Sequence, residues 1–132
     1  MESFKKIIIV RAKKPTDNNL NAELQWLSIS LGLFNLRDKE RSMFRLFVEL
    51  LKAAKRNEQL QSDELAYRLH LTRGTIVHHL NKLIDSGLVV TSHNKYMLRV
   101  RSLERLVKEI HADVDEFLKE VEDAGKDLDK RI

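Results

Sequence analysis

The chain contains no cysteine, and only four of its 132 residues are glycine. The lack of cysteine excludes disulfides, thiolate metal ligands and cysteine nucleophiles together. With so few glycines a nucleotide-binding loop is hard to build, and neither G-x-S-x-G nor H-E-x-x-H occurs. Nothing in the sequence places two carboxylates in apolar surroundings for acid–base work. We therefore predict that the protein is not an enzyme and carries no cofactor.

Long hydrophobic runs are also missing. No apolar run approaches the roughly 18 to 20 residues that cross a bilayer. The opening stretch MESFKKIIIVRAKK has basic residues around a short apolar core, with no small-residue cleavage site after it. The sequence therefore predicts a cytoplasmic protein that does not act at a membrane.

Aromatic residues make up 6% of the chain, so no platform for stacking bases is visible and RNA is a less favoured partner. The net charge is +4, but it is unevenly spread. From Ser102 onward ten acids face six bases, a net of −4, which leaves +8 for the rest. This pattern indicates a basic working part and an acidic appendage, although the acids also suit a plain solvated helix face.

The length favours one domain with extensions, and we divide it into residues 1–36, 37–101 and 102–132. In the N-terminal extension, the β-branched run Phe4–Ala12 predicts a strand. Turn-forming residues follow, and Leu20–Phe34 then shows apolar residues on one helical face, with Gly32 and Asn35 at its end. The role of this extension is left open by the sequence.

The middle part begins with a central core helix, capped by Asp38 and ending at about Arg56. Its broad apolar face is formed by Met43, Phe44, Phe47, Leu50, Leu51 and Ala54. Ser62 is expected to cap a second, short helix with Leu65, Ala66 and Leu69 on its inner face. A very short connection at His70-Leu71 then leads to a third helix, which is helix-turn-helix geometry.

The third helix lies in the stretch LTRGTIVHHLNKLIDSGLVV, from Leu71 to Val90. Thr72 is its expected cap, and Gly87 is expected to end it in the left-handed conformation. The spacing predicts a buried face made of Ile76, Leu80, Leu83 and Ile84. The side chains left outside are Arg73, Thr75, Val77, His78, His79 and Lys82.

Two β-type runs follow, Leu88–Ser92 and Tyr96–Arg101, around a polar tip at His93-Asn94-Lys95. Helices joined by a short turn and followed by a hairpin make a winged helix. The predicted fold is therefore mostly α with a small β-hairpin wing: a winged helix-turn-helix with an N-terminal extension and a long C-terminal dimerisation helix.

Exposed polar and basic side chains gather on this motif. An α-helix fits the major groove of DNA, and side chains at its N-terminal end reach base edges. Any one of these basic residues alone could simply contribute to solubility, but their clustering favours double-stranded DNA as the partner. We expect the helix over residues 72–86 to lie in the major groove and the wing over residues 88–101 to lie on the backbone or in the minor groove. The predicted DNA-binding residues are Thr72, Arg73, Thr75, His78, His79, Lys82, Lys95 and Arg99.

The order of these elements resembles the winged-helix transcription regulators of the ArsR type and their archaeal relatives, over about Asp38 to Arg101. The resemblance is carried by Thr72, Thr75-Ile76-Val77, His78-His79-Leu80, Leu83 and Gly87-Leu88-Val89. It implies a dimeric regulator that binds specific DNA sequences, with contacts from Arg73, Thr75, His78 and His79. The extension from Phe4 to Phe34 has no counterpart in it.

Many regulators of this type sense metals through cysteines or through paired histidines and carboxylates, and this chain departs from them. His111 and Asp115 lie one turn apart but are too few for a closed zinc site. His78 and His79 point about 100° apart on a helix, which is poor geometry for chelation. We therefore predict no metal site.

The segment after Ser102 has the most regular pattern in the chain. Apolar residues recur at alternating steps of four and three over nearly four heptads, which predicts a helix roughly 40 Å long. A helix of that length overhangs a small domain, so we expect its seam to pair with a second copy, in a homodimer with a coiled coil; packing onto its own chain is the alternative. The predicted dimerisation residues are Leu103, Val107, Ile110, Val114, Phe117 and Val121.

A different class of function also fits the pattern. Some winged helices bind proteins within transcription or chromosome-associated complexes and need not read DNA. In that case the helical seam would hold a protein of the transcription machinery, and the basic face would bind nucleic acid only loosely.

Overall fold

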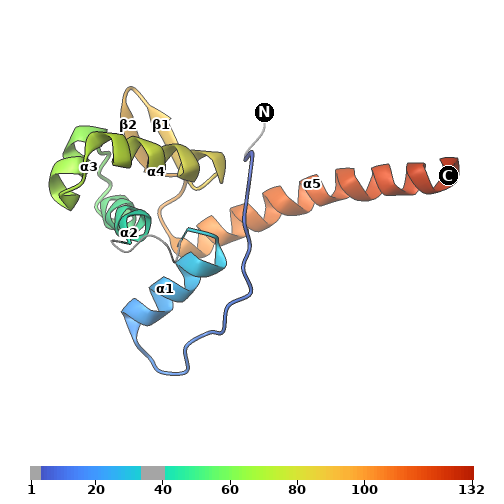
Figure 1. Cartoon of the computed structure of the whole chain (residues 1–132), viewed down its shortest axis with the longest axis horizontal. Coiled ribbons are helices and arrows are strands. Elements are labelled where there is room, and N and C mark those ends of the chain that lie inside the picture. Colours follow the sequence, from blue (N-terminus) through green and yellow to red (C-terminus); the bar gives the residue numbers. More distant parts are fainter. Residues whose placement is uncertain (1–3, 34–40) are drawn as a thin grey trace.

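The computed structural model describes residues 4–33 and 41–132. It confirms the predicted fold: a mostly helical winged helix-turn-helix with a two-stranded antiparallel hairpin and a long C-terminal helix. In Figure 1 the middle helices and the hairpin form one body, from which the last helix extends as an arm. The elements are α1 (Leu20–Ser30), α2 (Ser42–Lys55), α3 (Ser62–Leu69), α4 (Arg73–Asp85), β1 (Val89–Ser92), β2 (Lys95–Leu98) and α5 (Leu103–Arg131).

The core is built around α2, as its broad apolar face predicts. Leu46, Phe47 and Leu50 of this helix are fully buried. They pack with the inner faces of α3 and α4 and with the root of the hairpin. The other fully buried members of this cluster are Leu60, Leu65, Ile76, Leu80, Leu83, Leu88, Val89 and Leu106. Burial of these side chains, each worth about 1.5–3 kcal/mol, fixes α4 on α2 and leaves its other face outward.

The ends of the short helices follow local capping chemistry. Thr72 caps α4 as predicted, because its Oγ1 accepts a hydrogen bond from the Thr75 amide at 3.1 Å. Gly87 adopts φ +79° after α4, also as predicted. The cap of α3 is Gln61 and not Ser62, which is already helical. Gln61 and Glu64 form a reciprocal capping box, and this pairing outcompetes a serine cap one residue later.

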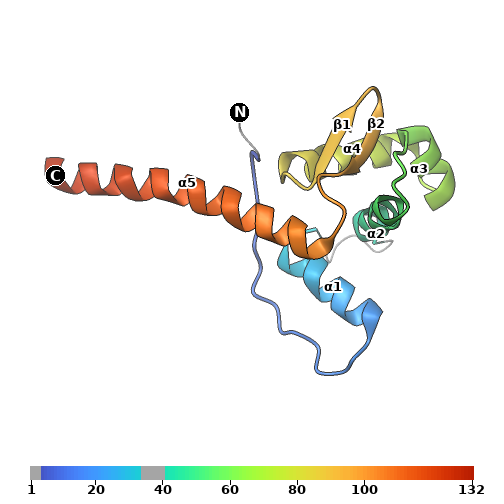
Figure 2. The same cartoon turned by 180° about the vertical axis from the view of Figure 1, so that it is seen from behind.

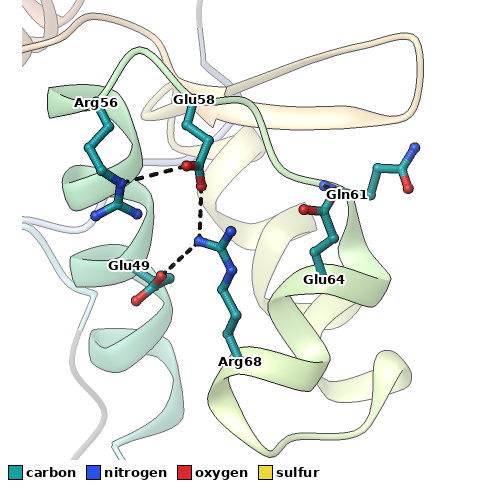
Figure 3. A network of polar contacts seen from close by, with 6 residues as sticks. All are labelled: Glu49, Arg56, Glu58, Gln61, Glu64 and Arg68. Carbon is teal, nitrogen blue, oxygen red and sulfur yellow. Dashed lines mark hydrogen bonds and ion pairs between the residues drawn. The ribbon is translucent and has the colours of Figure 1, made fainter.

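A network of charges joins α2 to α3 (Figure 3). Arg68 on α3 reaches Glu49 on α2 at 3.2 Å and Glu58 in the connecting loop at 2.9 Å. Arg56 lies 3.6 Å from the same Glu58 carboxylate. The hydrogen bond from Arg68 lowers the pKa of Glu58 below its ordinary value. The network therefore fixes the loop that leads into the helix-turn-helix.

The wing is shorter than predicted. Strands β1 and β2 pair from Val89↔Leu98 to Ser92↔Lys95. The two tip residues, His93 and Asn94, have φ of 53° and 62°, as a two-residue hairpin turn with matching twist requires. Lys95 consequently starts β2 and does not lie at the tip.

The predicted strand at Phe4–Ala12 is wrong. The segment is extended, but within the described residues it pairs with no strand. Its amides donate instead to helix ends: Lys5 to the Asp85 carbonyl at 2.7 Å and Val10 to the Ser30 carbonyl at 2.9 Å. β-branched residues favour a strand only where a ladder partner is near, and here the hairpin lies elsewhere.

The first helix ends earlier than the predicted Phe34. It stops at Ser30, and Gly32 follows with φ +70°. A Cβ on Gly32 would lie 2.6 Å from the Ile8 Cβ, so the extended segment approaches the backbone there as only glycine allows. The predicted cap Asp38 and the end marker Asn35 lie outside the described residues.

Helix α5 begins where the sequence places it. The Ser102 Oγ accepts a hydrogen bond from the Arg105 amide at 3.2 Å. Leu106 and Ile110 are buried against the body, whereas Phe117 and Val121 beyond them are about half exposed. Figure 2 shows the same arm from behind, free of the body over its outer part. Across the described ranges, no helix has the length and apolar character needed to span a membrane.

Candidate nucleic-acid interface

The outer face of α4 carries most of the predicted DNA-binding side chains. Thr72, Arg73, His78 and Lys82 are all exposed, and Thr75 is half-buried. Thr75, His78 and Lys82 lie away from the buried Ile76, Leu80 and Leu83, because α2 and α3 cover that side of the helix, while Arg73 lies at the open N-terminal end. The structure thus leaves Arg73 exposed at the N-terminal end of α4, and His78 and Lys82 exposed further along the helix.

The two threonines at the start of α4 have hydroxyl groups engaged with each other. Thr72 Oγ1 accepts from the Thr75 amide and donates to Thr75 Oγ1 at 2.9 Å. Thr75 then still has a hydroxyl proton to donate outward. The cap therefore orients Thr75 as a donor at the N-terminal end of the helix.

Arg73 is paired with a carboxylate that the sequence did not single out. Its Nε lies 3.4 Å from Asp63 Oδ1 at the start of α3, and the two side chains are 72% and 75% exposed. An ion pair in such solvent contributes little and exchanges readily for another anion. Asp63 therefore holds the guanidinium at the helix-turn-helix surface and leaves it available.

His79 does not face outward, contrary to the prediction. Its Nε2 lies 2.6 Å from the Oγ of Ser42, which is buried at the start of α2. The reason is helical geometry: His79 follows Ile76 by three residues and precedes Leu83 by four, so it shares their inward face. The spacing of His79 from Ile76 and Leu83 already indicates the inward face in the sequence, but the two adjacent histidines were both assigned to the outer face.

Arg99 is also not a free cation of the wing, contrary to the prediction. Its guanidinium makes a two-pronged contact with the Asp113 carboxylate and lies 3.0 Å from Glu109 Oε1, both on α5. The hydrogen bond with Asp113 raises the pKa of Arg99 above its ordinary value. Because Glu109 and Asp113 flank the buried Ile110, this contact joins the root of the wing to α5. Lys95, by contrast, is exposed.

The predicted dimerisation residues divide into two groups. Leu103, Ile110 and Val114 pack on the core of the same chain, so the alternative of intrachain packing holds for the inner half of α5. Leu106, fully buried, was missed because it lies off the heptad pattern. The residues left exposed are Val107, Phe117 and Val121, at 40%, 51% and 49%.

Among the residues that the structure describes, no cluster of side chains forms a candidate metal site. Over residues 4–33 and 41–132, no three side chains of His, Asp or Glu come close enough to hold an ion. His78 and His79 have ring centroids 5.8 Å apart and lie on different faces of α4.

Comparison with known families gives one match. Residues 48–91 match the model of the bacterial regulatory proteins of the ArsR family. The matched part runs from the middle of α2 through β1, about one third of the chain. No curated protein and no solved structure matches the chain. The helix-turn-helix of this protein is therefore similar to that of the ArsR family of bacterial regulatory proteins.

Proposed function

We propose that the protein is a homodimeric transcriptional regulator of the cytoplasm that binds a specific double-stranded DNA sequence. The single observation that carries this proposal is the separation of charge. Arg73, His78, Lys82 and Lys95 are exposed on α4 and the wing, while the acids concentrate on α5, which extends away from that surface. Such a surface fits a phosphate backbone and an open major groove.

The side chains have different tasks in this arrangement. Arg73 can donate two hydrogen bonds to guanine in the major groove, and Thr75 and His78 can donate to base edges or phosphates. Lys82, further along α4, and Lys95 on the wing suit phosphates. Base contacts specify the site, whereas phosphate contacts position the protein on any sequence.

The homodimer is supported by the exposed apolar residues of α5. Phe117, Val121 and Leu128 recur on one side of a helix whose flanks are charged, a pattern typical of a seam. Two copies joined there would hold two α4 helices about one turn of DNA apart, roughly 34–36 Å, and favour an inverted repeat.

Selection of bound duplexes from a random pool tests the proposal directly. We expect an enriched inverted repeat and an affinity that falls steeply between about 50 and 200 mM salt. Arg73→Ala should reduce discrimination between sites by about 1–3 kcal/mol, while Lys95→Ala should weaken all duplexes alike. Lys55→Ala, an exposed cation on α2, is the matched control. No duplex binding, or binding insensitive to salt, would favour the protein-binding class of winged helix.

Assembly is tested by placing a charge in the seam. Val121→Asp should abolish the dimer in sedimentation, because a carboxylate buried without a partner costs several kcal/mol, roughly 2–7 on transfer scales for polar groups and more when charged. Ala112→Asp adds the same charge to an exposed position of the same helix away from the seam and should leave the dimer intact. Equal effects of the two variants would remove α5 from the interface.

A further inference from the structure

The N-terminal segment, residues 4–14, is held by its backbone and by Ile7, which packs on the core, while most of its other side chains are exposed. Beyond the amide bonds to Asp85 and Ser30, the Trp26 Nε1 donates to the Ala12 carbonyl at 2.9 Å. Ile8, Ile9 and Val10 are nevertheless 49%, 67% and 42% exposed. Adjacent exposed apolar side chains on an ordered segment are typical of a surface that binds another protein.

The charge of this segment has one sign. It contains five bases and no acid, and the bases, all exposed, are Lys5, Lys6, Arg11, Lys13 and Lys14. The apolar run therefore sits between two basic flanks.

The outer half of α5, residues 115–129, has the opposite character. It holds seven acids against two bases, a net charge of −5. Phe117, Leu118, Val121 and Leu128 are each about half exposed among these acids. The two surfaces therefore match in apolar character and in charge. Each has apolar side chains that are about half exposed, and the flanking charges sum to +5 on the segment and −5 on the outer half of α5.

Within one chain the two surfaces do not cover each other, because Ile8 to Val10 and the outer residues of α5 are both exposed. The start of the segment meets α5 of its own chain, where the Phe4 and Phe117 rings form an edge-to-face contact with centroids 6.1 Å apart. From there it runs toward α1, away from the free end of the arm (Figure 1). Ile8 to Val10 are fixed beside the end of α1 by the close approach to Gly32.

We propose that in the homodimer the N-terminal segment of each copy docks on the outer half of α5 of the other copy. The proposal rests on the homodimer proposed above and names what the second copy contributes to it. A two-fold axis repeats the contact, so each free arm receives one segment. Opposite flanking charges favour the docking of a segment on an arm, whereas two segments, each with five bases and no acid, repel each other.

Cross-linking tests the contact itself, since the natural chain has no cysteine. We would prepare Ile9→Cys and Val121→Cys as separate full-length chains, mix them and oxidise. The expected product is a covalent dimer containing one chain of each variant, in excess over a mixture of Ile9→Cys with Ala112→Cys. Disulfides formed only between identical chains, or no excess over the control, would overturn the proposal.

Charge reversal gives a second, independent test. Variant A reverses three segment bases (Lys6→Glu, Arg11→Glu and Lys13→Glu), and variant B reverses three arm acids (Glu120→Lys, Glu122→Lys and Asp129→Lys). Each alone should raise the dimer dissociation constant about tenfold or more, and mixing A with B should restore a heterodimer, which keeps one wild-type contact. A control with three reversed cations on α2 and the wing (Lys55→Glu, Lys95→Glu and Arg101→Glu) should dimerise normally.

The two proposals fail in different ways. A monomeric wild-type chain in sedimentation would remove the homodimer and this contact together. A dimeric wild type whose variant A dimerises unchanged would overturn the segment contact alone and leave a seam between the two α5 helices.

Discussion

The contact between Arg99 and Asp113 gives the sharpest prediction, because it reassigns a cation from DNA binding to the positioning of the wing. The guanidinium holds both Asp113 oxygens, and the two side chains are 22% and 13% exposed. Exposed ion pairs contribute about 0.2–1 kcal/mol, and breaking a fully buried pair costs about 3–5 kcal/mol. This pair lies between those limits.

We expect Arg99→Met to lower the free energy of unfolding by about 2 kcal/mol, since it keeps the aliphatic stem but leaves two carboxylates one turn apart. Asp113→Asn should cost about 1 kcal/mol, because Glu109 still faces the guanidinium. The double variant should show a coupling of about 1–2 kcal/mol in a double-mutant cycle. Arg101→Met, an exposed neighbour, is the control and should change stability little.

Urea denaturation at one fixed protein concentration measures these differences, because dimerisation would otherwise shift them. DNA binding supplies the second readout. Lys95→Met should reduce the dependence of log affinity on log salt by about 0.9, the value of one phosphate contact. Arg99→Met should leave that slope unchanged. A slope reduced equally by both, with no coupling to Asp113, would return Arg99 to the DNA surface.

Two further predictions concern the body of the protein. Arg68 lowers the pKa of Glu58, so this carboxylate stabilises the fold above the ordinary carboxyl pKa, and the contribution is lost as pH falls through the lowered value. Glu58→Gln should therefore make stability, measured by thermal unfolding, less dependent on pH in that acid range. An unchanged pH dependence of stability in acid would contradict this. Gly32→Ala should lower the free energy of unfolding by about 1–2 kcal/mol for the left-handed backbone alone, and it should displace Ile8. The displacement would appear as faster hydrogen exchange at the Val10 amide, which donates to the Ser30 carbonyl. Unchanged exchange would show that the segment is not held there.

The helix-turn-helix could be predicted from the sequence because its signals are local. Thr72 and Gly87 mark the two ends of α4, and Ile76, Leu80 and Leu83 repeat at the spacing of one helix face. Capping and periodicity act within a few residues, so no knowledge of the rest of the chain is needed.

The errors concern contacts between residues distant in sequence. Arg99 appears in the sequence as one more basic residue of the wing, and only the docking of α5 brings Asp113 to it. The run Phe4–Ala12 has strand composition, but whether a strand forms depends on a partner that the sequence cannot place. His79 differs, since its spacing from Ile76 already indicated the inward face.

The two proposals together offer a reason why so basic a segment lies in a protein that we propose discriminates among DNA sequences. Five exposed bases on residues 4–14 would bind any duplex through its phosphates, and such binding competes with site recognition. If the acidic arm of the second copy covers the segment, its charge is neutralised and the basic surface is reduced to α4 and the wing. The arm itself is then kept from the phosphates, because a stretch with a net charge of −5 is repelled by them. Dimerisation would thus lower non-specific affinity relative to the monomer while it sets the spacing of the two α4 helices.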